Sequence, residues 1–293
     1  MGYGKAPWNF KGQALYQLSL VKIEEARKFV PPELPLVNFF GWTLGGFYLA
    51  RYTDSPVGSF EELVALAGLV WDFPTSCAWA ARVYVNNKEA RDHGISSVGL
   101  PSRLAGFKAI KLHQLNRGGG GNNGNMFKSG KTSKRSWWDV AAPGRTENEN
   151  ANSTVSTVAM ELSNLEPRGR GRRGLHTPVC HLDMPHVPNT WAPRIQMFLP
   201  SFSGATLEYP GLLKYSLKLM THVRFLKPVS LRLPDERHED DHSSGEVLDA
   251  VLGGKPLLCM AFDNMEMVVQ PPEPWTPLKG KEVSIERMQG KAV

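Results

Sequence analysis

The sequence has 293 residues, of which 41% are hydrophobic, and carries a formal net charge of +6 at pH 7. This length and composition are sufficient for one large domain or two small ones with a full core. No apolar run reaches the roughly 18 to 20 residues of a membrane-spanning helix. Three cysteines that lie far apart in the chain argue against a disulfide framework and favour buried thiols.

The positive charge is concentrated in one region. Residues 117–174 contain ten basic and five acidic residues, so this region carries +5 and the rest of the chain +1. The run RGRGRRG lies in a basic loop predicted over residues 166–176, and such a loop could bind an anionic surface. Because no aromatic residues interleave with it, a solvated loop is favoured and no nucleic-acid partner is expected.

The N-terminal part of the chain reads as strands with one short helix. An amphipathic helix is predicted over residues 22–30, where Pro31 and Pro32 end it. Gly45 and Gly46 lie inside a strand-forming stretch and indicate a bulge or a close backbone approach. Strands are predicted over residues 13–21, 35–53, 62–71 and 75–86.

The segment from Arg82 to Ala105 links a strand to a short helix and a turn. Asn86 or Asn87 is expected to cap a helical turn over residues 88–93, and Gly94 to end it. The segment closes on GLPSRLA, where a proline fixes the backbone just before two polar side chains. A turn of this kind can hold a polar pair rigidly at the mouth of a sheet or barrel.

The remainder of the chain adds strands around an insertion. Residues 117–151 are rich in Gly and Asn and are predicted to form a flexible insertion within a single domain spanning 1–293. A charged loop is predicted over residues 235–246. Further strands are predicted over residues 107–115, 157–165, 194–199, 212–219, 221–226 and 256–269, and near Val179. Many strands with few short helices and no alternating βα rhythm predict an α+β, mainly β, closed antiparallel sheet.

The segment from Arg82 to Ala105 resembles the acetoacetate decarboxylase superfamily in three successive parts: the strand VYVNN, the helical turn after it and GLPSRLA. Members of the superfamily carry G-x-P-K-K-L-A where this chain has GLPSRLA. The resemblance implies a closed antiparallel β-barrel or double cone with a few short outer helices. It also implies that the first lysine of the motif forms a Schiff base with a β-keto acid, while the second lowers the pKa of the first.

Ser102 and Arg103 replace that pair of lysines. A hydroxyl cannot condense with a ketone, and an arginine stays protonated at any working pH. Schiff-base decarboxylase activity is therefore not expected. Whether the chain is an enzyme of another kind stays open.

Longer stretches narrow the resemblance. Between Lys5 and Asn86 the chain is similar to the plant neoxanthin-deficient proteins, a lysine-lacking branch of the superfamily. The stretches that carry this similarity are KAPW, FGWTLGGFYLARY, DSPVGSFEELV and VWDFPTSCAWAARVYVN. This resemblance implies a role in neoxanthin formation from violaxanthin, on the route to abscisic acid precursors, and a xanthophyll as hydrophobic ligand. The conversion is an isomerisation that needs an acid at the epoxide oxygen and a base at a ring-adjacent carbon, so no cofactor is expected.

The superfamily also carries a catalytic glutamate, and Glu62 stands in register with it. Glu62 facing the cation of Arg103 in an apolar barrel could serve as a general acid or base. The alternative is a structural ion pair of Glu62 with Arg103 or Arg82. The predicted pocket consists of Glu62, Arg82, Leu100, Pro101, Ser102 and Arg103. The motif HLDMPH lacks the spacing of a zinc site, so no metal is expected.

Several functions stay open at this point. The chain could be an accessory or carotenoid-binding protein, an isomerase without a Schiff base, a decarboxylase or aldolase-type enzyme that uses Lys108 or Lys111, or a non-catalytic adaptor. An oligomer or a partner among the pathway enzymes is equally open. The N-terminus shows no targeting peptide, which favours the cytoplasm, whereas the pathway favours plastids.

Overall fold

The computed structural model describes residues 2–72, 75–113, 128–129, 156–165, 177–188, 190–234 and 245–276. The predicted basic loop over 166–176 lies outside these residues. So does the predicted insertion over 117–151, except for the two-residue strand β6 (Lys128–Ser129), which pairs with β5 (Ser102–His113).

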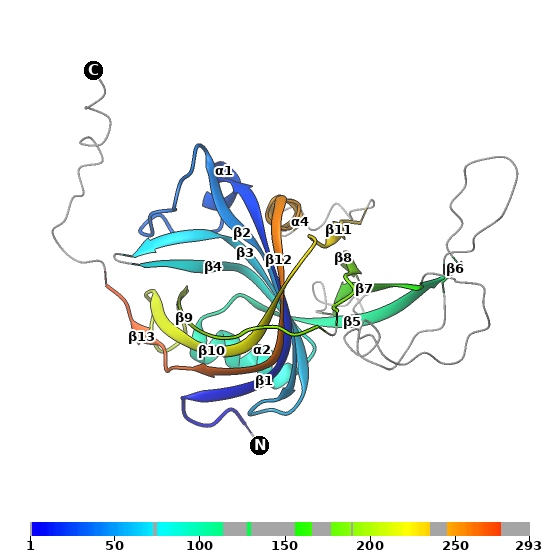
Figure 1. Cartoon of the computed structure of the whole chain (residues 1–293). Helices are drawn as coiled ribbons and strands as arrows, with labels where there is room; N and C mark the ends of the chain where they lie inside the picture. Colours follow the sequence, from blue (N-terminus) through cyan, green and yellow to red (C-terminus); the bar gives the residue numbers. More distant parts are fainter. Residues whose placement is uncertain are drawn as a thin grey trace, which may run out of the picture.

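Seven strands close into a barrel (Figure 1). Their order around the barrel is β4-β3-β2-β1-β12-β10-β9, and β9 returns to β4 through parallel pairing at Ala78↔Ser201 and Trp79↔Phe202. The strands are β1 (Trp8–Lys22), β2 (Trp42–Asp54), β3 (Phe60–Asp72), β4 (Thr75–Val85), β9 (Arg194–Ser203), β10 (Leu213–Leu226) and β12 (Lys255–Val269).

A second, smaller sheet extends from the side of the barrel, to the right in Figure 1. It begins where β5 pairs in parallel with the end of β4, at Val83↔Ser102. It continues through β7 (Ser156–Asn164), β8 (Thr177–Met184) and β11 (Ser230–Arg232), while the short β13 (Glu273–Pro274) pairs with β10.

Short helices lie outside the barrel. α1 (Ile23–Arg27) contacts α4 (Gly245–Leu252) at one end, and α2 (Lys88–His93) follows β4. The side chain of Asn87 caps α2 by accepting a hydrogen bond from the amide of Ala90 at 3.0 Å. None of the helices within the described ranges has the length and apolar character to cross a membrane.

These features confirm the predicted mainly β fold with a closed barrel and few outer helices, and they correct it in detail. The barrel is not wholly antiparallel, since β9 pairs with β4 in parallel. α2 ends at His93 with Gly94 as its C-cap, as predicted, but Gly94 keeps a right-handed helical conformation, so the chain continues as one π-helical turn, η1 (Gly94–Val98), which ends at Gly99, whose φ is +72°. The two strands predicted over 212–219 and 221–226 form one strand with a register shift between Met220 and His222. His181, of the motif HLDMPH, lies on β8.

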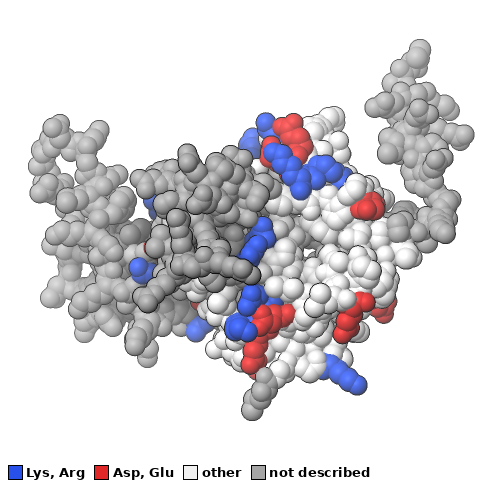
Figure 2. All heavy atoms as spheres, turned by 180° about the vertical axis from the view of Figure 1, so that it is seen from behind, with Lys and Arg blue, Asp and Glu red and all other residues white. Residues whose placement is uncertain are grey.

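The pleat of β3 divides the core in two. Leu63, Ala65 and Ala67 are fully buried on the outer face of the barrel wall, in the cluster that includes α1 and α4. Glu62 and Val64 point to the other side, into the barrel interior. Figure 2 shows basic and acidic side chains in small groups around a broad uncharged area, in keeping with the near-neutral charge of the chain outside residues 117–174.

Candidate functional site

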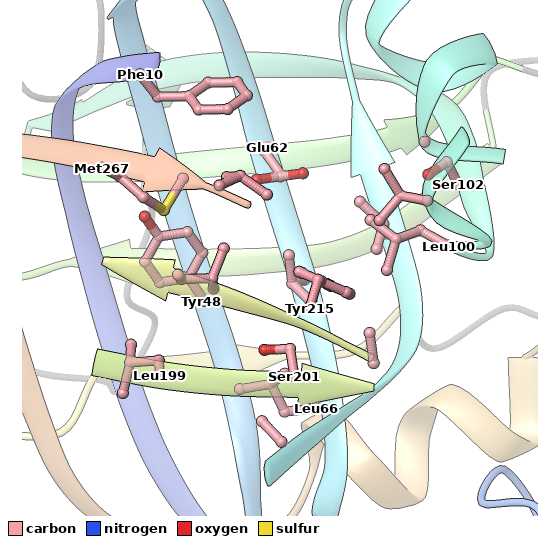
Figure 3. Close-up of a pocket in the computed structure, with 18 of the residues that line it drawn as sticks. Phe10, Tyr48, Glu62, Leu66, Leu100, Ser102, Leu199, Ser201, Tyr215 and Met267 are labelled. Atoms are coloured by element: carbon pink, nitrogen blue, oxygen red, sulfur yellow. The ribbon is translucent and has the colours of Figure 1, made fainter. Parts of the chain in front are cut away.

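The barrel encloses a cavity of about 270 Å³ (Figure 3). Strands from all around the barrel line it, together with Tyr3 of the N-terminal segment, α2, η1, Leu100 and the first residue of β5, Ser102. Most of the lining is aromatic or aliphatic. Its polar groups are Glu62, His93, the hydroxyls of Ser76, Ser102 and Ser201, and those of Tyr3, Tyr16, Tyr48, Tyr52 and Tyr215.

Glu62 is the acidic residue of the described lining, and an aromatic cluster holds it in place. The Tyr52 hydroxyl donates a hydrogen bond to Glu62 Oε2 at 2.8 Å. The Tyr52 ring is itself fixed by Phe10 and Phe60, with ring centroids 5.1 and 4.8 Å away. Burial raises the pKa of Glu62 to about 7, although the hydrogen bond from Tyr52 acts in the opposite direction. Glu62 is therefore present in both protonation states near neutral pH.

The other titratable groups of the cavity do not exchange protons near neutral pH. Burial raises the pKa of Tyr16 to about 12 and raises the pKa values of Tyr3, Tyr48 and Tyr215 further. Burial lowers the pKa of His93 to about 4, so its imidazole is neutral. Among the described lining residues, Glu62 alone can both donate and accept a proton at neutral pH.

Aromatic residues cover the cavity beside Glu62. The ring of Tyr3 stacks on His93 with centroids 3.8 Å apart, and Trp8 meets the same imidazole edge-on at 4.4 Å. The negative charge of Glu62 contributes to the raised pKa of Tyr3, which places this aromatic group within electrostatic range of the carboxylate. The N-terminal segment thus forms one end wall of the cavity.

The structure brings together only part of the predicted pocket. Glu62, Leu100 and Ser102 line the cavity, and Ser102 is 5% exposed. Arg82 and Pro101 are not lining residues, and the side chain of Arg103 is exposed. Because Ser102 and Arg103 are consecutive residues of β5, their side chains point to opposite faces. This corrects the predicted position of Arg103 opposite Glu62.

Tyr52 and His93 were not among the predicted site residues. Tyr48 and Tyr52 are four positions apart on a predicted strand, so alternation places both on one face, and that signal could have identified them. No comparable signal exists for His93, because its position depends on how α2 packs against the N-terminal segment.

The lysines considered as replacements for the Schiff-base pair are not in the cavity. Lys108 is exposed, and the side chain of Lys111 lies outside what the structure describes. The described lining contains no lysine. We therefore predict that the protein, treated with acetoacetate and then borohydride, shows no covalent adduct by mass spectrometry. A Ser102→Lys variant, which places an amine in the cavity, is the positive control, and a reduced adduct on the unaltered protein would contradict this prediction.

The raised pKa of Glu62 also predicts how stability depends on pH. The folded protein binds the proton of the Glu62 carboxyl more tightly than the unfolded chain does. Protonation of Glu62 therefore stabilises the fold fully below the ordinary pKa of 4.5, and this stabilisation is lost as the pH rises through about 7. Relative to Glu62→Gln, the free energy of unfolding of the wild type should fall by about 3 kcal/mol over this range. Urea unfolding of both proteins across the range measures this, and a constant difference would show that Glu62 is not perturbed.

Known proteins with similar sequences match the chain over almost its whole length. No protein family model matches the chain. It is 41% identical to "Protein NEOXANTHIN-DEFICIENT 1" of Arabidopsis thaliana over 287 residues, covering 92% of this chain and 94% of that protein. The proteins of the same name in Oryza sativa subsp. japonica and Solanum lycopersicum are 41% and 37% identical, over 96% and 93% of this chain and 94% and 93% of their own lengths.

Solved structures show the same fold at low identity. An acetoacetate decarboxylase superposes with a TM-score of 0.53 at 12% identity, covering 95% of this chain and 93% of its own. The acetoacetate decarboxylase of Legionella pneumophila gives 0.50 at 13% identity, over 94% and 90% of the two chains. At these identities the likeness concerns the fold alone.

Proposed function

The chain belongs to the NEOXANTHIN-DEFICIENT 1 family, and on this basis we propose that it acts in neoxanthin formation by binding the epoxide-bearing end of violaxanthin in its barrel. The observation that carries the proposal is Glu62, a carboxyl group with a pKa of about 7 held by Tyr52 in an apolar cavity. An aromatic lining suits the end ring and polyene of a xanthophyll.

The conversion is an isomerisation, and Glu62 can supply both of its proton transfers. Protonated Glu62 donates its proton to the epoxide oxygen as the ring carbon–oxygen bond breaks, which leaves a hydroxyl. The carboxylate then takes a proton from the carbon next to the ring, and the electrons of that C–H bond complete two adjacent double bonds. Glu62 ends protonated, as it began, and the product has the same atoms as the substrate.

The surroundings of Glu62 support this cycle. The Tyr52 hydroxyl, 2.8 Å away, stabilises the carboxylate that exists between the two transfers. The described lining offers no lysine or arginine to neutralise that carboxylate, which keeps it basic enough to take the second proton. Ser102, which lines the cavity, stands where the superfamily motif has its reactive lysine, so the shorter side chain leaves room for a ligand in the cavity.

A binding titration with violaxanthin tests the proposal. Quenching of aromatic fluorescence by the polyene should saturate at one ligand per chain. The variant Val64→Trp, which fills the middle of the cavity, should abolish saturation while retaining a cooperative thermal transition. Equal quenching of both proteins would refute cavity binding. Saturable binding without any product would instead support an accessory role in the same pathway.

A further inference from the structure

The cavity is long rather than round. Its lining residues on β3 run from Phe60 to Leu69, and those on β4 run antiparallel from Val85 to Ser76. Nine residue steps of strand span roughly 30 Å, or about 23 Å along the axis of a barrel whose strands tilt by about 40°. A volume of about 270 Å³ distributed over that length is a narrow channel.

The two ends of this channel differ in chemistry. The near end holds Glu62, Phe10 and Tyr52, and the far end lies beyond Leu66, where β4 and β9 pair. Figure 3 shows Phe10 and Glu62 at one end and Leu66 and Ser201 at the other.

Small side chains and hydroxyls mark the far half. β4 presents Ser76, Ala78 and Ala80 to the channel there, in place of the valines of the near half. On β9, which pairs with β4 at Ala78, the hydroxyl of Ser201 hydrogen-bonds Tyr215. The far half is therefore lined by small side chains along β4 and has hydroxyl groups of its own, although the charge of Glu62 still acts on Tyr215.

We propose that the channel holds a carotenoid lengthwise, with one end ring against Glu62, the polyene running past Leu66 and Ala78, and the other end ring emerging from the barrel at the far end. The inference rests on the proposed function and adds to it that the protein recognises the length of the ligand. A narrow apolar channel with a carboxyl group at one end complements an apolar rod that carries a polar ring, and an end ring that leaves the channel stays in contact with water. A short keto acid would leave most of this apolar surface unfilled.

Two ligands that share one end group test this inference. One is violaxanthin, and the other is the half-length epoxy aldehyde obtained by cutting violaxanthin at its central double bond. Violaxanthin should bind at least about tenfold more tightly, because only it buries polyene in the far half. The variant Ala78→Phe should remove most of this advantage and leave the affinity for the half-length aldehyde unchanged.

Thermal unfolding establishes that the variant is folded. Ser76→Phe, at the half-buried beginning of β4, obstructs the same end if Ala78→Phe fails to fold. Equal affinity for the two ligands, or equal weakening of both by a far-end variant, would overturn the inference and leave the proposed function standing. If neither ligand binds, both fail together.

Discussion

Replacing Glu62 by glutamine should abolish conversion of violaxanthin while leaving its binding intact. The amide is nearly isosteric and can still accept the hydrogen bond from Tyr52, so the cavity keeps its shape. It cannot donate a proton to an epoxide and take another in return. Loss of a general acid–base group costs about 10² to 10⁴ in rate, and the combined role of Glu62 predicts the upper part of that range.

The matched control is Glu61→Gln. Glu61 neighbours Glu62 on β3, and burial also raises its pKa, to about 6, but it accepts a hydrogen bond from the Asn86 side chain and does not line the cavity. Its variant should convert violaxanthin at close to the wild-type rate. Similar losses in both variants would show that charge on β3, rather than a carboxyl in the cavity, is what matters.

Replacing Gly46 by alanine should destabilise the barrel severely. Gly46 has a φ of +124°, and a Cβ there would lie 2.0 Å from the carbonyl oxygen of Gln17 on the neighbouring β1. Gln17 cannot shift freely, because its buried side chain donates to the carbonyl oxygen of Val229 at 3.2 Å. Backbone strain together with displacement of β1 should lower the free energy of unfolding by about 3 kcal/mol or more.

Gly58→Ala separates the two causes. Gly58 also has a positive φ, +83°, but nothing lies within 4 Å of a Cβ built on it. Its variant should lose only about 1–2 kcal/mol for the unfavourable backbone conformation. Urea unfolding of both variants measures the difference, and equal losses would mean that the close approach to β1 contributes nothing.

The close approach at Gly46 illustrates what the sequence could predict. The glycines within this strand predicted either a β-bulge or a close approach of two backbones. The structure shows the close approach, between Gly46 and the backbone of β1. The alternation of apolar and polar residues similarly predicts most strands, because successive side chains of a strand point to opposite faces and only one face is buried. The parallel pairings of β4 with β5 and β9 could not be predicted, since they join segments whose register depends on tertiary packing.

The error at Arg103 has a specific cause. The superfamily resemblance implies that the turn around Pro101 brings both lysines of the superfamily motif to the barrel interior, so both Ser102 and Arg103 were expected to face one cavity. The strand β5 instead begins at Ser102, and strand geometry separates it from its neighbour. The motif therefore identified the correct turn, but only one of its two polar residues lines the cavity.

A single-turnover incubation of the purified protein with stoichiometric violaxanthin tests the central claim most directly. Chromatographic separation of the pigments should show neoxanthin, of unchanged mass, forming in the dark without any added protein, and faster below about pH 7, where Glu62 is protonated, than above it. Violaxanthin recovered unchanged at every pH, from protein that demonstrably binds it, would contradict the role of Glu62.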